Sequence, residues 1–326
     1  MIPARIIGTG SALPARRVST RELLAELFPG GASAELEARI GIQHRHWLGP
    51  GETAAGLAAA ALRGALEAAR LDPSALRRII LVTSTGGDQM IPATANGVAG
   101  ALGIDGGCDA FDVNNSCVGF LTGLDLAARS AATGVGPVGV VAVETFSRQI
   151  APAGRRAYLV LGDAAAAAIV GPTTRPGEGI LASVLENSSA LRGKMLMAHP
   201  GREGSRGYHD FDTPSEEIAH TAITLIERAS GAALAKAGLR MADIDWVLPH
   251  QPNGEIFRLL AERMAIDSRR VVPVYPDAGS LGAASVPLSL DRLMRRHAPP
   301  AGTRVLLTAV GSGTAHGAII HCGGAP

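Results

Sequence analysis

Short apolar runs alternate with longer segments rich in Ala and Leu along almost the whole chain, and this alternation constrains the fold more than any other feature. Four of the runs have the length and apolar content of buried strands: 78–83, 138–143, 246–248 and 304–308. Three of the longer segments carry apolar residues every three or four positions, as helices do: 53–70, 118–130 and 216–237. Strands that alternate with helices in this way predict an α/β protein.

A weak internal repeat predicts how this α/β chain is organised. Residues 66–71 resemble residues 234–239, and a strand follows closely in both places. The same helix–turn–strand unit in both halves suggests an internal duplication. The turn-rich connector 171–177 marks the division between the halves, and the Gly-rich stretch 201–212 predicts a surface loop. We therefore expect two domains: residues 1–174 and residues 175–326.

Composition and charge exclude several functional classes. The formal net charge is +1 and aromatic residues make up only 3% of the chain, which argues against nucleic acid as a partner. No apolar run approaches the ~20 residues that span a bilayer. The start of the chain also lacks the basic and apolar regions of a signal peptide. We therefore expect a cytoplasmic protein with neither a nucleic-acid nor a membrane partner.

The cysteines and histidines do not have the spacing of disulfide or metal sites. The three cysteines form neither a C-x-x-C pair nor an even-numbered framework: Cys108, Cys117 and Cys322. His44 and His46 are too few for a metal centre. Residues 8–10 lack the third glycine of a dinucleotide-binding motif. We expect reduced thiols, no metal and no permanently bound cofactor.

Cys117 stands where a predicted strand turns through polar residues into a predicted helix. A thiol at the N-terminus of a helix lies near the positive end of the helix dipole and near unpaired N–H groups, which favour the nucleophilic thiolate. Free cysteines are also among the most buried residues in proteins, so an inert core thiol is the alternative interpretation. We interpret Cys108 and Cys322 as inert core thiols.

His250 follows the predicted strand 246–248, at the carboxyl end where α/β folds place their sites. A single histidine is more often structural than catalytic, but two strand ends in duplicated halves would bring His250 to Cys117. Two segments of small residues could complete such a site. Residues 277–287 fit a tight loop that leads into a helix, and residues 309–314 could point N–H groups at an oxyanion. Ordinary helix packing and an ordinary turn explain them equally well.

A Cys–His pair supports two chemistries. Papain-like proteases also place a cysteine about 130–150 residues before a histidine. The C-G-[SA]-C-[WY] surroundings of that cysteine are absent here, and a duplicated α/β chain is not the scaffold of those proteases. Acyl transfer from a thioester therefore accounts better for Cys117 and His250.

Six segments, in the same order, resemble the β-ketoacyl-acyl-carrier-protein synthase III family of the thiolase superfamily: 5–14, 39–42, 111–120, 161–165, 248–253 and 283–287. The resemblance covers nearly the whole chain. It implies the thiolase fold, in which two duplicated βαβαβ-type halves pack as a layered α/β/α/β/α sandwich.

The resemblance also implies roles for individual residues. In the family, acyl-CoA acylates a cysteine, and a histidine and an asparagine then help to decarboxylate a malonyl thioester, whose carbanion attacks the acyl-enzyme. Cys117 matches that cysteine and His250 matches that histidine. The oxyanion N–H groups would belong to Cys117 and Ser312. Four further positions match substrate-binding residues of the family: Arg39 and Arg155 match two arginines that meet CoA, Ile91 stands at the gate between subunits, and Asn253 belongs to the His250 motif.

Several positions depart from the family pattern. Ser280 stands where the family has its catalytic asparagine, so the catalytic role of this position is open. Glu255 replaces an arginine that docks the carrier protein, and Glu35 aligns near a tryptophan that flanks the CoA adenine. Ile91 and Val310 replace phenylalanines. These departures imply an altered pocket and an altered donor or acceptor, as in the specialised-metabolism branches of the family.

The resemblance therefore implies a homodimeric condensing enzyme of fatty-acid or polyketide-type biosynthesis. It would self-acylate on Cys117 from acyl-CoA and extend the acyl group with a malonyl thioester, with acyl carrier protein as a further candidate partner. The close alternative is a non-decarboxylating acyltransferase that uses an alcohol or amine acceptor. A third is a catalytically silent partner subunit of a heteromeric synthase, against which the retention of Cys117 and His250 counts.

Overall fold

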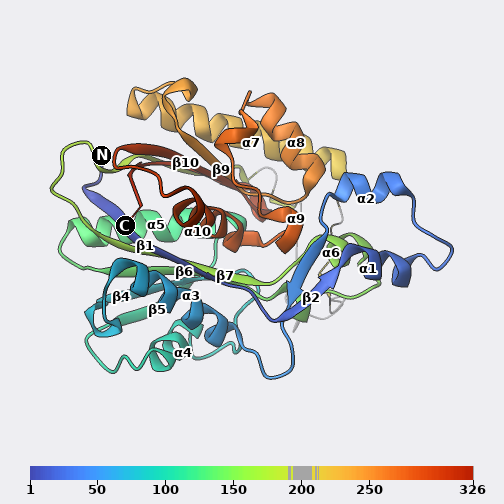
Figure 1. The fold of residues 1–326 in the computed structure, drawn as a ribbon, viewed down its shortest axis with the longest axis horizontal. Coiled ribbons are helices and arrows are strands. Elements are labelled where there is room, and N and C mark those ends of the chain that lie inside the picture. The colour runs from blue at the N-terminus through green and yellow to red at the C-terminus, as the bar shows by residue number, and fades with distance from the viewer. Residues whose placement is uncertain (190–191, 194–207, 210, 212, 326) are drawn as a thin grey trace.

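Two β-sheets are stacked in the computed structural model, with helices between them and on both outer faces (Figure 1). The structure describes residues 1–189, 192–193, 208–209, 211 and 213–325. No helix within these ranges is long and apolar enough to cross a membrane.

The first sheet has five strands in the order β1-β7-β6-β4-β5. Their bounds are β1 (Ala4–Ala12), β4 (Arg78–Val82), β5 (Asp109–Val113), β6 (Val138–Glu144) and β7 (Ala164–Pro172). Strand β4 pairs parallel with both β5 and β6, whereas β7 pairs antiparallel with β1 and β6. All seven residues of β6 are buried, as expected of a strand covered on both faces.

The second sheet repeats this arrangement without the fifth strand. Its order is β8-β11-β10-β9, with bounds β8 (Gly179–Asn187), β9 (Trp246–Pro249), β10 (Thr303–Val310) and β11 (Ala315–Gly323). Strand β9 pairs parallel with β10, and β11 pairs antiparallel with β10 and β8. The order and directions match those of β1-β7-β6-β4, so the two halves share one topology, as the sequence repeat predicts. The boundary between residues 174 and 175 falls in the connection between β7 and β8, and as a domain boundary it stays a prediction.

Three helical layers enclose the sheets. Helices α3 (Ala54–Ala69) and α4 (Thr94–Ala101) cover the outer face of the first sheet, and α7 (Ser215–Ala237) and α8 (Gly254–Arg263) cover the outer face of the second. Helices α5 (Gly119–Ala132) and α10 (Ser285–His297) lie between the sheets, where residues of both helices and both sheets form the largest buried cluster (Figure 1). A helix between two sheets is apolar on most of its surface, and α5 is accordingly rich in Leu, Ala and Gly.

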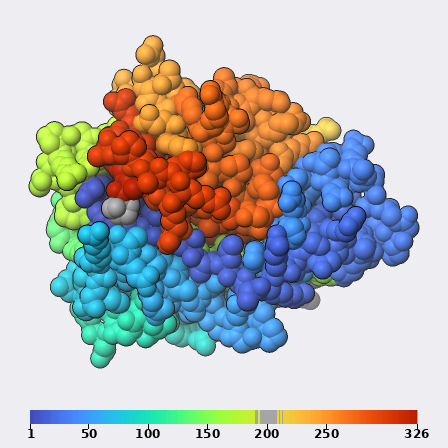
Figure 2. All heavy atoms as spheres, viewed as in Figure 1, coloured from blue at the N-terminus to red at the C-terminus, as the bar shows by residue number. Residues whose placement is uncertain are grey.

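A smaller region, built mainly from the N-terminal part of the chain, lies beside these layers. It contains a two-stranded sheet and short helices: β2 (Arg16–Ser19), β3 (His44–Trp47), α1 (Thr20–Leu27), α2 (Ala34–Ile40) and α6 (Arg155–Val160). The short helix α9 (Tyr275–Ala278) packs against β3. Figure 2 shows the blue N-terminal region packed against the orange C-terminal half.

The structure confirms the predicted layered α/β sandwich. The four predicted strands and three predicted helices are all present, each within two residues of its expected ends. The predicted surface loop at 201–212 lies largely outside the described residues.

Candidate active site

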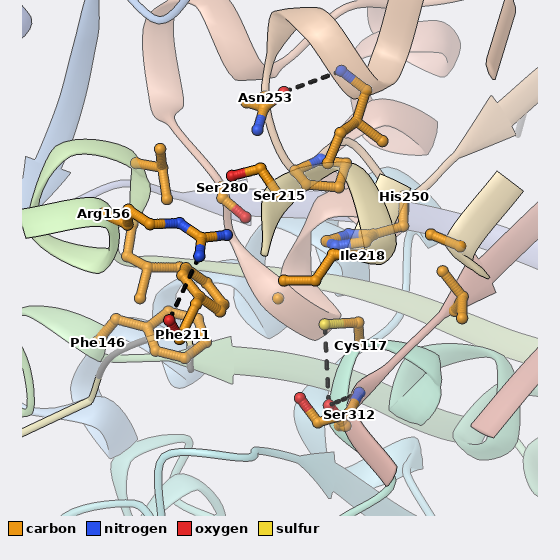
Figure 3. Close-up of a pocket in the computed structure, with 18 of the residues that line it drawn as sticks. Cys117, Phe146, Arg156, Phe211, Ser215, Ile218, His250, Asn253, Ser280 and Ser312 are labelled. Atoms are coloured by element: carbon orange, nitrogen blue, oxygen red, sulfur yellow. Dashed lines mark hydrogen bonds between the residues drawn. The ribbon is translucent and has the colours of Figure 1, made fainter. Parts of the chain in front are cut away.

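A cavity of about 650 Å³ opens where segments from both halves of the chain converge. Its walls include most of the residues that the sequence singles out: Cys117, His250, Ser280, Ser312, Arg39 and Asn253. Figure 3 shows that Cys117 comes from the first half of the chain, whereas His250, Ser280 and Ser312 come from the second. The convergence predicted from the strand ends is thus present.

Cys117 lies in a tight connection between β5 and α5. The strand ends at Val113, a 3₁₀ turn spans Ser116–Val118, and α5 begins at Gly119. Ser116 has a φ of +48°, in the left-handed region that non-glycine residues rarely adopt. The helix therefore begins just after the cysteine, as predicted, and the unusual backbone of Ser116 directs the chain so that Cys117 lies on the cavity wall.

The predicted thiolate character of Cys117 is wrong for the free protein. Although the side chain is only partly covered, the protein packed around it raises the pKa of the thiol to about 12. The carboxylate of Glu144 raises this pKa further, and the hydroxyl of Ser116 lowers it. Desolvation disfavours the charged form of a thiol, and here it outweighs the hydrogen bonds from the Ser116 hydroxyl and the Cys117 N–H, which lower the pKa. The thiol is therefore neutral at physiological pH and needs a base when it attacks.

His250 lies directly beyond the end of β9. Its N–H donates to the Thr308 carbonyl at 2.8 Å, which extends the parallel pairing of β9 and β10 by one residue. The side chain is 5% exposed, and burial lowers the pKa of the imidazole to about 4. Nδ1 is buried and has no hydrogen-bond partner within the described part of the chain. The ring is therefore neutral at pH 7 and can accept a proton.

Ser280 is fixed by its backbone while its hydroxyl stays available. The Ser280 N–H donates to the Val160 carbonyl at 2.7 Å, and the Ser280 carbonyl accepts from the Gly162 N–H at 3.0 Å. The hydroxyl has no hydrogen-bond partner among the residues that the structure describes, and the side chain lines the cavity. A bound molecule could thus accept a hydrogen bond from Ser280. Within the segment 277–287, α9 ends at Ala278 and α10 begins at Ser285, so a tight connection leads into a helix, as predicted.

The glycine turn that follows β10 lies against the Cys117 turn. A Cβ atom on Gly311 would lie 2.9 Å from the Cys117 nitrogen, so this approach requires a glycine. The Ser312 N–H donates to the Ser116 hydroxyl at 3.0 Å. The turn therefore brings the Ser312 N–H beside Cys117, where an oxyanion donor is expected, although Ser116 already accepts a hydrogen bond from it.

An ion pair joins two helices at the cavity wall. Arg39 on α2 lies 3.1 Å from Glu255 on α8, measured from Nη2 to Oε2, and its Nε donates to the same carboxylate. Asn253 caps α8 because its Oδ1 accepts from the Ile256 N–H at 2.9 Å. The Asn253 amide nitrogen is the part of that side chain left for a ligand.

Two of the predicted substrate-binding residues lie outside the cavity of this single chain. The Arg155 guanidinium packs 5.4 Å from the centre of the Phe28 ring, and Arg155 is not among the described residues that line the cavity. The next residue, Arg156, lines the cavity and donates to the Thr213 carbonyl at 2.7 Å. Ile91 is 84% exposed and also lies outside the cavity.

Sequence reasoning missed a buried carboxyl group beside the site. Glu144 ends β6, is 0% exposed, and accepts hydrogen bonds from the Ser84 hydroxyl at 2.8 Å and the Ala283 N–H at 3.2 Å. Burial raises the pKa of Glu144 to about 7. The available signal was an acidic residue directly after the apolar run 138–143. Within the described ranges, no group of three or more His, Cys, Asp or Glu side chains could hold a metal ion.

Comparison with known proteins gives one consistent family. The model "3-Oxoacyl-[acyl-carrier-protein (ACP)] synthase III" matches residues 111–189, and the model of the C-terminal part of the same family matches residues 234–321. The first range contains Cys117, and the second contains His250, Ser280 and Ser312.

Curated proteins and solved structures agree with the family models. The chain is 35% identical to the β-ketoacyl-[acyl-carrier-protein] synthase III of Rhizorhabdus wittichii, over 97% of this chain and 98% of that protein. It is 34% identical to the Neisseria meningitidis protein of the same name, with the same coverage. The solved 3-oxoacyl-(acyl carrier protein) synthase III of Pseudomonas aeruginosa has a TM-score of 0.88 at 29% identity, over 98% of each chain. A priming β-ketosynthase of the R1128 polyketide pathway has a TM-score of 0.89 at 31% identity, over 99% of this chain and 97% of that one.

Proposed function

We propose that the protein self-acylates on Cys117 and extends the acyl group with a malonyl thioester. The premise is that the chain belongs to the 3-oxoacyl-[acyl-carrier-protein] synthase III family of the thiolase superfamily. The observation that carries the proposal is that Cys117, His250, Ser280 and Ser312 line one cavity built from both halves of the chain. Acyl-CoA is the proposed donor, and acyl carrier protein is the proposed carrier of the malonyl unit.

The first step is acylation. The Cys117 sulfur attacks the thioester carbonyl carbon of acyl-CoA, and its proton passes to His250, which is neutral because burial lowers the pKa of the imidazole. The Cys117 and Ser312 N–H groups would stabilise the oxyanion that develops on the carbonyl oxygen. The carbon–sulfur bond to CoA then breaks, and the departing thiolate takes the proton back from the imidazolium.

The second step is decarboxylative condensation. Loss of CO₂ from the malonyl unit leaves an enolate, whose charge lies mainly on the thioester oxygen. A ring N–H of His250 and the hydroxyl of Ser280, which has no hydrogen-bond partner among the described residues, are the proposed donors to that oxygen. The enolate carbon attacks the acyl carbon on Cys117, a carbon–carbon bond forms, and the bond from the acyl carbon to the Cys117 sulfur breaks. Cys117 leaves as a thiolate and takes a proton from water to restore the thiol.

Two observations favour a second candidate, acyl transfer to an alcohol or amine. A serine hydroxyl is shorter than the asparagine amide of the family and supplies one proton, which weakens support for decarboxylation. In addition, Glu255, which pairs with Arg39, stands where the family has an arginine for the carrier protein. Transfer to an alcohol needs only a base and the oxyanion donors.

The first test concerns the nucleophile, and it also separates an enzyme from a silent subunit. Incubation with a panel of acyl-CoAs should add one acyl mass to the peptide that contains Cys117, and Cys117→Ala should remove it. Acylation that persists in Cys117→Ala, or that maps to Cys108 or Cys322, would overturn the assignment.

The second test concerns Ser280 and decides between the two acceptors. Enzyme acylated beforehand is mixed with malonyl thioester labelled at the free carboxyl group, and release of labelled CO₂ is followed in wild type and Ser280→Asn. We expect slow release from wild type and a rise of up to roughly 10²–10³-fold in Ser280→Asn, since this is the typical value of one well-placed donor. No release from either protein would overturn the condensation and favour the alcohol or amine acceptor. Fast release from wild type, unchanged or lowered by Ser280→Asn, would remove the main support for that second candidate.

A further inference from the structure

The second oxyanion donor is occupied in the free protein by a neighbouring side chain. The Ser312 N–H, which follows β10, donates to the hydroxyl oxygen of Ser116 at 3.0 Å. The same hydroxyl group lies 3.8 Å from the Cys117 sulfur, toward which it donates. Dashed lines between Cys117 and Ser312 in Figure 3 mark these two interactions.

The local backbone is built to hold Ser116 in this position. Its φ of +48° costs conformational energy for a residue other than glycine. A Cβ atom on Gly311 would lie 3.0 Å from the Ser116 hydroxyl oxygen and 2.9 Å from the Cys117 nitrogen. The missing side chain at Gly311 and the left-handed turn at Ser116 together allow the hydroxyl to reach the Ser312 N–H.

We infer that Ser116 is a positioning residue that caps the Ser312 N–H and competes for it with the carbonyl oxygen of the incoming thioester. The inference rests on the proposed acylation of Cys117. A single N–H cannot make two strong hydrogen bonds at good geometry, so the oxyanion gains its full stabilisation only when the Ser116 hydroxyl turns away. The loss of the neutral hydrogen bond from Ser312 to Ser116 then contributes to the acylation barrier.

Ser116 has a second effect, which acts in the opposite direction. Its hydroxyl lowers the pKa of the Cys117 thiol by donating toward the sulfur, against the larger effects of burial and of Glu144. Loss of the hydroxyl would therefore make the thiol less reactive while it frees the oxyanion donor. The two effects separate experimentally, because alkylation by iodoacetamide depends on the thiol alone, whereas acylation by acyl-CoA also needs the oxyanion donors.

The experiment compares both rates on Cys117 in wild type, Ser116→Ala and Ser116→Gly, each followed by mass spectrometry below saturation. We expect the ratio of the acylation rate to the alkylation rate to rise about two- to tenfold in both variants, which is the range expected for one neutral hydrogen bond. Ser116→Gly loses the same hydroxyl but also relieves the left-handed backbone. Agreement between the two variants therefore assigns the change to the hydroxyl, and a rise confined to Ser116→Gly would overturn the inference.

Thr122→Val is the matched control. The Thr122 hydroxyl accepts from the Asn115 amide at 2.8 Å, close to the same turn, yet no hydrogen bond joins it to Ser312 within the described residues, and valine keeps its shape. Its ratio should equal that of wild type. An unchanged or lowered ratio in Ser116→Ala, with normal acylation of wild type, would overturn only this inference. No acylation of Cys117 in wild type or in either Ser116 variant would overturn the proposed function together with it.

Discussion

Replacement of Glu144 by glutamine should change how the stability of the protein depends on pH. The carboxyl group is fully buried, and it has no ion-pair partner in the described part of the chain. Burial raises its pKa from the ordinary value of 4.5 to about 7, because the folded protein disfavours the ionised form more than its hydrogen bonds favour it. Glutamine has nearly the same shape and does not titrate.

The sign and size of the effect follow from the two pKa values. Below pH 4.5 the carboxyl group is protonated in both folded and unfolded chains, so it imposes no ionisation cost. Between pH 4.5 and about 7 the unfolded chain loses the proton and the folded chain keeps it, so stability falls as pH rises. Above that range the loss is complete, at about 3 kcal/mol for this difference in pKa.

The assay is denaturant unfolding of wild type and Glu144→Gln at equal protein concentration, from pH 4.5 to 8. The free energy of unfolding of the variant minus that of wild type should rise by about 3 kcal/mol across this range. A change in hydrogen bonds to Ser84 or Ala283 adds a constant offset that does not depend on pH, so it does not affect the comparison. Parallel pH curves for the two proteins would refute the reasoning, since they would mean that Glu144 has the same pKa folded and unfolded.

Two further predictions concern the nucleophile and the assembly. Because burial raises the pKa of Cys117 to about 12, its alkylation by iodoacetamide should accelerate about tenfold per pH unit from pH 6 to 9. A plateau in the alkylation rate below pH 8 would instead indicate a thiolate stabilised by the helix terminus. Met90 and Ile91 are adjacent apolar residues that are 79% and 84% exposed, and the resemblance assigns Ile91 to a gate between subunits. For the predicted homodimer, light scattering should therefore give twice the 33.3 kDa of one chain. A mass near 33 kDa at micromolar concentration would contradict the predicted homodimer.

The parts of the fold and the site that were predictable from the sequence depend on local pattern and on topology. The apolar run 138–143 and the periodic segment 216–237 determine their own secondary structure, because the strand is buried on both faces and the helix buries one continuous face. Cys117 and His250 were expected to meet because both follow strands in duplicated halves, and α/β folds place their sites at the carboxyl ends of strands. Neither argument needs the packing of a particular side chain.

The properties that the sequence did not reveal depend on packing between distant segments. The pKa of Cys117 is set by the atoms that surround it and by the charge of Glu144, 27 positions away in sequence, so its position before a helix is a poor guide. Arg155 and Arg156 are adjacent on one short helix, and only its orientation on the rest of the fold decides which of them lines the cavity. The left-handed backbone of Ser116 is likewise imposed by the turn, since serine has no preference for it.

These charge states constrain the order of events in the proposed acylation. In the free protein the thiol of Cys117 and the imidazole of His250 are both neutral, since burial raises one pKa to about 12 and lowers the other to about 4. The site therefore does not store a thiolate, and the ion pair forms only as the thioester is attacked. Charge then appears on the carbonyl oxygen in the same step, so the N–H groups that meet this oxygen contribute at the highest point of the barrier. In such a site the hydrogen bond from Ser312 to Ser116 affects the rate directly, whereas in a site with a stored thiolate the thiol pKa would dominate.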